Sequence, residues 1–163
     1  MVTTLLTTHH VGGRAGTRTF PSMKYFEKDL VNVLYEADES SISGIKKETH
    51  YLPSKTIILP DCLSGSAGKR KFYIYNNRYF SSLYPLKPEQ TGAYSFDSQF
   101  GWDTDPKALS IVETLTLDTV TLDEVVKREK SENIPSPDFL SLDTQGSELE
   151  ILKGGEFAIR NTV

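Results

Sequence analysis

Short apolar runs, each bounded by polar or turn-forming residues, recur along the chain and alternate with stretches of helical period. Apolar and β-branched residues dominate four runs that we predict as strands, Leu5–Val11, Val31–Tyr35, Lys55–Leu59 and Phe139–Leu142. Helices are predicted between them, over Thr17–Leu30, Ser40–Glu48 and Thr121–Lys130. Ser40 or Ser41 is predicted to cap the second helix, and Thr121–Glu124 has the pattern of a capping box for the third. Strands that alternate with helices are typical of a parallel, doubly wound sheet, so we predict an α/β fold.

The middle of the chain carries additional elements. Lys71–Tyr75 and Ser81–Pro85 are predicted to pair as an inserted β-hairpin, with Asn76-Asn77 in the turn between them. Ile111–Leu117 alternates apolar and polar residues and is predicted as a further strand. The segment Lys87–Lys107 is longer than most loops, and its aromatic residues favour a lid that packs over the rest of the fold.

The stretch around the last predicted strand carries the clearest sign of chemistry. The apolar run ends at Asp143, Gly146 permits a sharp turn, and Glu148 falls in the first turn of a predicted helix. Doubly wound proteins bind ligands at the carboxyl ends of their strands, where Asp143 is expected. From spacing alone, Asp143 has two interpretations, a ligand-binding or catalytic carboxylate and a simple helix cap.

A glycine cluster follows the first predicted strand, and an acid ends the second. Gly12, Gly13 and Gly16 let the backbone approach a ligand closely, because they have no Cβ. Glu36 comes about 20 residues later, where a carboxylate accepts hydrogen bonds from both hydroxyls of a nucleoside ribose. A nicotinamide dinucleotide site needs the same parts, but its G-x-G-x-x-G fingerprint differs from the G-G-x-x-G spacing found here.

Two motifs resemble the FkbM family of S-adenosylmethionine-dependent methyltransferases. Residues 138–154 match D-F-L-x-L-D-x-Q-G-x-E-x-x-x-L-K-G, and Gly12 and Gly16 match the family's acid-x-Gly-x-x-x-Gly loop. Glu36 resembles the family's acid at the end of the second strand. The resemblance implies a Rossmann-like class I methyltransferase sheet. We expect residues 1–163 to be a single partial domain of that kind, truncated at the C-terminus, with four core strands and an inserted β-hairpin.

The same resemblance implies S-adenosylmethionine as cofactor. Residues at the carboxyl ends of the first three strands are then expected to hold it, namely Gly12, Gly13, Gly16, Glu36, Ala37, Asp61 and Cys62. The last two would lie against the adenine. His10 stands where the family has the acid that binds the amino group of the cofactor, and a neutral imidazole cannot supply the same charge-assisted bond.

The reaction that the resemblance implies is O-methylation of a hydroxyl on a sugar or natural-product-like small molecule. Asp143 is the candidate base for the acceptor hydroxyl, and Gln145 is the candidate for orienting substrate or cofactor. Two alternatives stay open: an NAD-dependent oxidoreductase of Rossmann type, and an inactive or binding-only fragment.

Composition and charge limit which functional classes of protein remain possible. A net charge of −4 argues against a general nucleic-acid or membrane surface, although residues 68–85 mix basic and aromatic side chains. The apolar runs are too short to span a bilayer, and Cys62 is the single cysteine, which fits a reducing, cytoplasmic compartment. The three histidines have no metal-ligand spacing, so no metal site is predicted.

Overall fold

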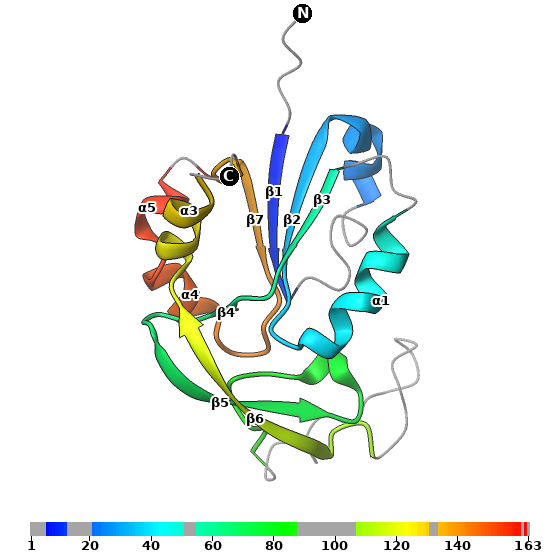
Figure 1. Ribbon diagram of the computed structural model, residues 1–163, viewed down its shortest axis with the longest axis vertical. Helices are drawn as coiled ribbons and strands as arrows, with labels where there is room; N and C mark the ends of the chain where they lie inside the picture. The colour runs from blue at the N-terminus through cyan, green and yellow to red at the C-terminus, as the bar shows by residue number, and fades with distance from the viewer. Residues whose placement is uncertain are drawn as a thin grey trace, which may run out of the picture.

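The larger of two sheets is parallel and has four strands. The computed structural model describes residues 6–12, 21–50, 55–87, 107–130, 134–160 and 162. Strands β1 (Leu6–Val11), β2 (Leu30–Tyr35), β3 (Lys55–Leu59) and β7 (Phe139–Leu142) pair in the order β3-β2-β1-β7 (Figure 1). This order is compatible with part of a doubly wound nucleotide-binding sheet, so the predicted α/β fold with a parallel sheet is confirmed.

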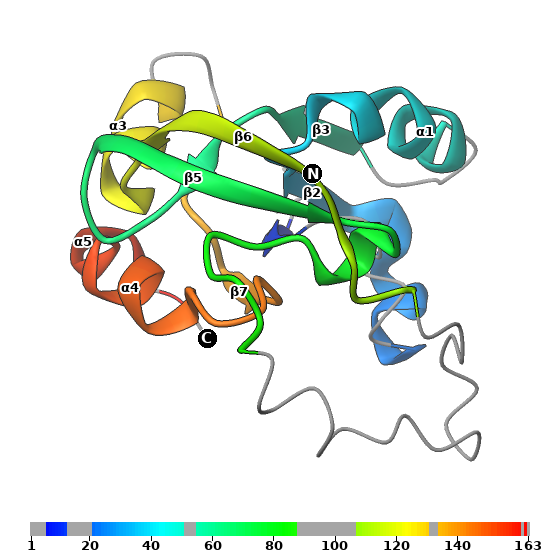
Figure 2. The same cartoon turned by 90° about the horizontal axis from the view of Figure 1, so that it is seen from below.

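Helices cover both faces of this sheet. Figures 1 and 2 show α3 (Leu122–Lys130), α4 (Glu148–Lys153) and α5 (Glu156–Ile159) on one side, and α1 (Glu39–Thr49) with the 3₁₀ helix η2 (Pro21–Asp29) on the other. The core on the first side joins alternate residues of β2 to α3, α4 and α5, and its buried members include Val31, Val33, Tyr35, Val125, Ile151 and Ala158. Since both faces are covered, the whole of β2 is buried, as parallel strands usually are.

The helix boundaries differ in part from the prediction. Residues 17–20 of the first predicted helix lie outside the described residues, and the part that is described, η2, is a 3₁₀ helix that ends at Asp29. The cap of α1 is Asp38, whose Oδ1 accepts the Ser40 amide at 3.1 Å; Ser40 and Ser41 were predicted for this role. The capping box of α3 is confirmed by reciprocal bonds between Thr121 and Glu124.

A second, smaller sheet lies across the carboxyl ends of the parallel strands (Figure 1). It consists of β4 (Cys62–Leu63), β6 (Ile111–Val120) and β5 (Gly68–Tyr75), in the order β4-β6-β5. β5 is antiparallel to β6 and β4 is parallel to it. The sheet buries a small core that includes Phe72, Ile74 and Leu83.

The predicted hairpin between Lys71–Tyr75 and Ser81–Pro85 is not confirmed as the main pairing. The main partner of β5 is β6, and the segment around Ser82 meets β5 only through an isolated bridge to Tyr73. Asn77 caps a short 3₁₀ helix, η3 (Arg78–Phe80), because its side chain accepts the Tyr79 amide. β6 also runs three residues further than predicted, to Val120. β6 is the main partner because it pairs with β5 along its whole length.

Three sequence predictions concern residues that the structure does not describe. The lid predicted between Lys87 and Lys107 falls almost entirely within residues 88–106, and Gly13 and Gly16 fall within 13–20. That the chain is a truncated part of a larger sheet also stays a prediction. Among the helices of the described ranges, none is long and apolar enough to cross a lipid bilayer.

Candidate cofactor and active site

A pocket opens where the carboxyl ends of the parallel strands meet the second sheet. It encloses about 620 Å³ of space between atoms, part of which is open solvent. Its floor consists of residues at the ends of β1, β2 and β7, namely Val11, Gly12, Tyr35, Glu36, Ala37, Asp143, Thr144 and Ser147. The remaining walls are Asp61, Cys62 and Leu63 after β3, and Phe72, Arg78, Tyr79, Ser81 and Leu83 from β5 and the segment after it.

Gly12 and Asp143 hold the ends of β1 and β7 together. Gly12 has φ +82°, and a Cβ placed on it would lie 2.1 Å from the carbonyl oxygen of Asp143. The Asp143 amide donates to the Val11 carbonyl at 3.0 Å, which continues the pairing of the two strands into the pocket. Glycine at position 12 is therefore needed for the contact between the strand ends, in addition to any contact with a ligand.

Glu36 brings a carboxylate to the pocket from the end of β2. The residue is 6% exposed, and its Oε1 accepts the Asp38 amide at 2.9 Å, which fixes the side chain at the corner between β2 and α1. A carboxylate has about four acceptor positions, and the bond from the Asp38 amide occupies one of them. Ala37 follows in the same wall, and its small side chain leaves room beside the carboxylate.

The corner after β3 is fixed by an ion pair. Both oxygens of Asp61 accept from Arg128 of α3, at 3.1 and 2.6 Å. Any bond from Asp61 to an adenine amine would share the carboxylate with Arg128. Burial raises the pKa of the Cys62 thiol to about 11, so the thiol is protonated at neutral pH and contributes an apolar surface to the pocket.

The loop after β7 positions Asp143 without using it as a helix cap. The cap of α4 is Ser147, and the turn is closed by Glu148, whose carboxylate accepts the amides of Thr144 and Gly146 at 2.8 and 2.9 Å. Gln145 has φ +58°, and its Nε2 donates to Asp143 Oδ1 at 2.8 Å. Burial, with a smaller effect of the Glu148 charge, raises the pKa of Asp143 above its ordinary value. The helix-cap interpretation of Asp143 is therefore not supported.

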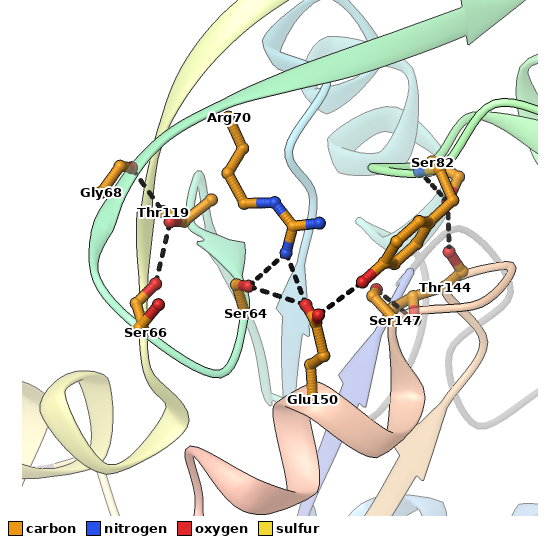
Figure 3. Close-up of polar contacts among 10 residues, drawn as sticks. Ser64, Ser66, Gly68, Arg70, Ser82, Thr119, Thr144, Ser147 and Glu150 are labelled. Carbon is orange, nitrogen blue, oxygen red and sulfur yellow. Dashed lines mark hydrogen bonds and ion pairs between the residues drawn. The ribbon is translucent and has the colours of Figure 1, made fainter.

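The segment after β5 fixes this loop from the other side. Ser82 Oγ lies 3.0 Å from the carbonyl oxygen of Thr144 (Figure 3). It lies 3.0 Å from the carbonyl oxygen of Gln145 as well, so its single proton is shared between the two carbonyls. The Ser82 Oγ also accepts the Tyr84 amide at 3.1 Å. The second sheet thus determines where the Asp143 loop lies.

A charged network lies next to this contact. Arg70 of β5 and Glu150 of α4 point toward each other, with an Nη1–Oε2 distance of 2.5 Å, and Ser64 bonds to both (Figure 3). The Tyr84 hydroxyl donates to the other oxygen of Glu150 at 2.5 Å, and the Arg70 guanidinium lies 5.1 Å from the Tyr84 ring centroid. These contacts join the second sheet to the helix that follows Asp143.

The two histidines of β1 are buried in the sheet. His9 bonds through Nδ1 to the Tyr35 hydroxyl at 2.8 Å and through Nε2 to the Pro135 carbonyl at 3.1 Å, and the His10 ring lies against Phe139. Burial lowers the pKa of both histidines to about 4, so both are neutral near pH 7. His10, at the position of the family's acid, is not among the described residues that line the pocket. Across the described ranges, no three His, Cys, Asp or Glu side chains gather as a metal site requires.

Six of the predicted site residues therefore share one pocket: Gly12, Glu36, Ala37, Asp61, Cys62 and Asp143. Gln145 reaches this site through Asp143, and Gly13 and Gly16 are outside the described residues. Ser81 and Leu83 come from Ser81–Pro85, the segment that was predicted as one strand of the hairpin. Arg78 and Tyr79 were not predicted, and their only signal was the mixture of basic and aromatic residues around them.

Comparison with known protein families agrees with the resemblance found in the sequence. Residues 10–163 match the methyltransferase FkbM domain, and the chain belongs to this family. The match begins at His10, directly before the glycine loop, and extends through the Asp143 motif. No curated protein and no solved structure matches the chain. Membership supports a methyltransferase and does not favour a nicotinamide-dependent oxidoreductase.

Proposed function

We propose that the protein transfers a methyl group from S-adenosylmethionine to a hydroxyl oxygen of a sugar or natural-product-like small molecule. One observation carries the proposal. In a chain of the FkbM family, Gly12, Glu36 and Asp143 come from three different strands and line the same pocket at the carboxyl edge of a parallel sheet. This edge is where open α/β sheets bind their ligands.

The residues present fit the proposed cofactor. Glu36 supplies a buried carboxylate for the two ribose hydroxyls, and Leu63, Phe72 and Leu83 supply apolar walls of the kind that a purine base requires. The pocket-lining acids also favour a ligand that carries positive charge, as a sulfonium does. S-adenosylmethionine supplies a methyl group that its positive sulfur has already activated for displacement.

The protein's own contribution is alignment of the acceptor and removal of its proton. Asp143 is placed to accept the proton of the acceptor hydroxyl, and its raised pKa makes the carboxylate a stronger base than an exposed aspartate. Gln145 is a positioning residue in this proposal, because its amide donates to one oxygen of Asp143 and so restrains the carboxylate. Thr144 and Ser147 add polar groups beside Asp143 that suit a hydroxylated acceptor.

Parallel calorimetric titrations test the proposal. The protein is titrated with S-adenosylmethionine, S-adenosylhomocysteine and NAD under identical conditions. We expect saturable binding of the first two and no binding of NAD at the same concentrations. Incubation with methyl-labelled S-adenosylmethionine and a panel of sugars then identifies the acceptor by transfer of label. Binding of NAD in preference to S-adenosylmethionine would overturn the proposal.

A further inference from the structure

The short helix η3 forms a wall of the pocket and is held in place where it begins. Asn77 precedes it, and the Asn77 side chain accepts the Tyr79 amide at 3.1 Å. The Asn77 amide donates to the Ala108 carbonyl at 3.0 Å, next to the start of β6. The position of η3 is thus fixed by the second sheet, and residues 78 and 79 both reach the pocket.

Arg78 binds η3 to the start of α1, just after the end of β2. Its Nη1 lies 2.5 Å from Asp38 Oδ2 and 3.0 Å from Ser40 Oγ. Asp38 is only 2% exposed and caps α1, so the partner of Arg78 is itself held in place. An ion pair with a buried carboxylate is screened by salt less than a surface pair. Asp38 is two residues beyond Glu36, so this contact places η3 beside the carboxylate proposed to bind the ribose.

Tyr79 is the large aromatic residue of this wall. Its side chain is 65% exposed, although the residue lines the same pocket as Glu36, Ala37 and Cys62. Single exposed aromatic residues are common on protein surfaces and need no explanation of their own. Tyr79 differs because it stands on a turn that Asn77 and Arg78 hold in place, in the wall of a pocket whose neighbouring acid suits a ribose. A planar base beside that ribose would cover the exposed ring.

We infer that Tyr79 stacks on the adenine base of the nucleoside whose ribose Glu36 binds. The inference rests on the proposed function and adds a base-binding residue to the site. Stacking uses the face of the ring and not the phenolic hydroxyl, so it requires an aromatic side chain but not a tyrosine. Arg78 acts on the base only through the position of η3.

Calorimetry with S-adenosylhomocysteine tests this role in four proteins: wild type, Tyr79→Ala, Tyr79→Phe and Tyr25→Ala. Tyr25 is the matched control, since it is 79% exposed on η2 and is not among the described residues that line the pocket. Loss of a base–aromatic stack should weaken binding by roughly five- to a hundredfold in Tyr79→Ala. Tyr79→Phe should bind within about twofold of wild type, and Tyr25→Ala should be unchanged.

The outcomes separate this inference from the proposed function. If wild type and Tyr79→Ala bind equally, Tyr79 has no role in binding the base, while the methyltransferase proposal stands. If wild type binds neither S-adenosylhomocysteine nor S-adenosylmethionine, both the stacking inference and the proposed function are contradicted. Should Tyr79→Ala melt at a lower temperature, Tyr79→Leu replaces it. A folded Leu variant that binds as tightly as Tyr79→Phe would show that stacking is not required.

Discussion

The backbones of Gly12 and Asp143 touch, with the Asp143 carbonyl oxygen occupying the position that a side chain at residue 12 would need. The distance from that oxygen to an added Cβ is 2.1 Å, and Gly12 has a φ of +82°. The end of strand β1 and the start of the Asp143 loop are therefore one structural unit. A change at either residue is transmitted directly to the other.

Gly12→Ala should destabilise the protein and displace Asp143. Left-handed backbone at a non-glycine residue costs about 1–3 kcal/mol, and the clash with the Asp143 carbonyl adds to it. We expect the Tm to fall by roughly 5 °C or more. Gly44→Ala is the control, because a Cβ there meets nothing within 4 Å and lies inside α1, where alanine should stabilise by roughly 0.5–1 kcal/mol. An unchanged Tm for Gly12→Ala would contradict the contact.

Glu36→Ala should weaken S-adenosylmethionine binding at least about tenfold, because it removes a charged acceptor for two hydroxyl donors. The alanine also loses the bond from the Asp38 amide, so Glu36→Gln is needed beside it. The glutamine keeps a carbonyl oxygen for that amide and should keep the Tm while still binding more weakly. Calorimetry gives the affinities, and exposed Glu113→Ala serves as the control. Equal affinity in all four proteins would remove Glu36 from the site.

Asp143→Asn should leave cofactor binding near normal and lower methyl transfer by about two to four orders of magnitude, because the proton acceptor is lost. The asparagine oxygen can still accept from Gln145, so the loop should keep its shape. Turnover, Tm and cofactor affinity are measured on the same sample, with the exposed Asp118→Asn as control. Normal turnover by folded Asp143→Asn would show that another group takes the proton.

Ser82→Ala should loosen the Asp143 loop. The change leaves two carbonyls, those of Thr144 and Gln145, without the hydroxyl that they share, at a cost of about 1–2 kcal/mol. We expect a fall in Tm of roughly 2–6 °C. Ser43→Ala is a matched control on the exposed side of α1 and should be nearly neutral. If both variants have the same Tm as wild type, the contact between Ser82 and the loop contributes nothing to stability.

Acidification should unfold the protein through the buried histidines. The pKa of His9 and of His10 is about 4 in the folded state against 6.5 unfolded, so the unfolded chain binds more protons between these values. Stability should be complete above pH 6.5 and should fall as the pH drops toward 4, by up to about 3 kcal/mol for each histidine. Urea denaturation at several pH values measures the loss. His10→Gln should flatten the profile, whereas the exposed His50→Gln should not.

The elements that the sequence predicted best are those whose signal is local. Lys55–Leu59 and Phe139–Leu142 have the predicted bounds, because each is an apolar run ended by a turn residue or an acid. The partner of β5 could not be predicted in the same way, since β6 begins far along the chain and the nearby Asn76-Asn77 pair suggested a hairpin turn. Pairing over such a separation is decided by burial of Phe72 and Ile74, which no short window contains.

The residues of the candidate site also divide into those with a local signal in the sequence and those without one. Gly12, Glu36 and Asp143 were predicted because acids and glycines at the ends of parallel strands converge on one edge of the sheet. Arg78 and Tyr79 were missed because they reach the pocket only after the second sheet has folded across that edge. The cap of α1 was missed for a smaller reason, as Asp38, Ser40 and Ser41 are all good capping residues and only the backbone conformation at Asp38 decides among them.

The position of β1 between β2 and β7 also affects the order in which the strands can pair while the protein is being synthesised. Thr7 and Asp138, which are 131 residues apart in the chain, are joined by a 2.8 Å bond. At ordinary rates of translation, β1 waits on the order of 10 s for this second neighbour to leave the ribosome. During that time β1 has one open edge, able to pair with the wrong strand. We therefore expect β1 to be among the last strands to reach its final protection from hydrogen exchange.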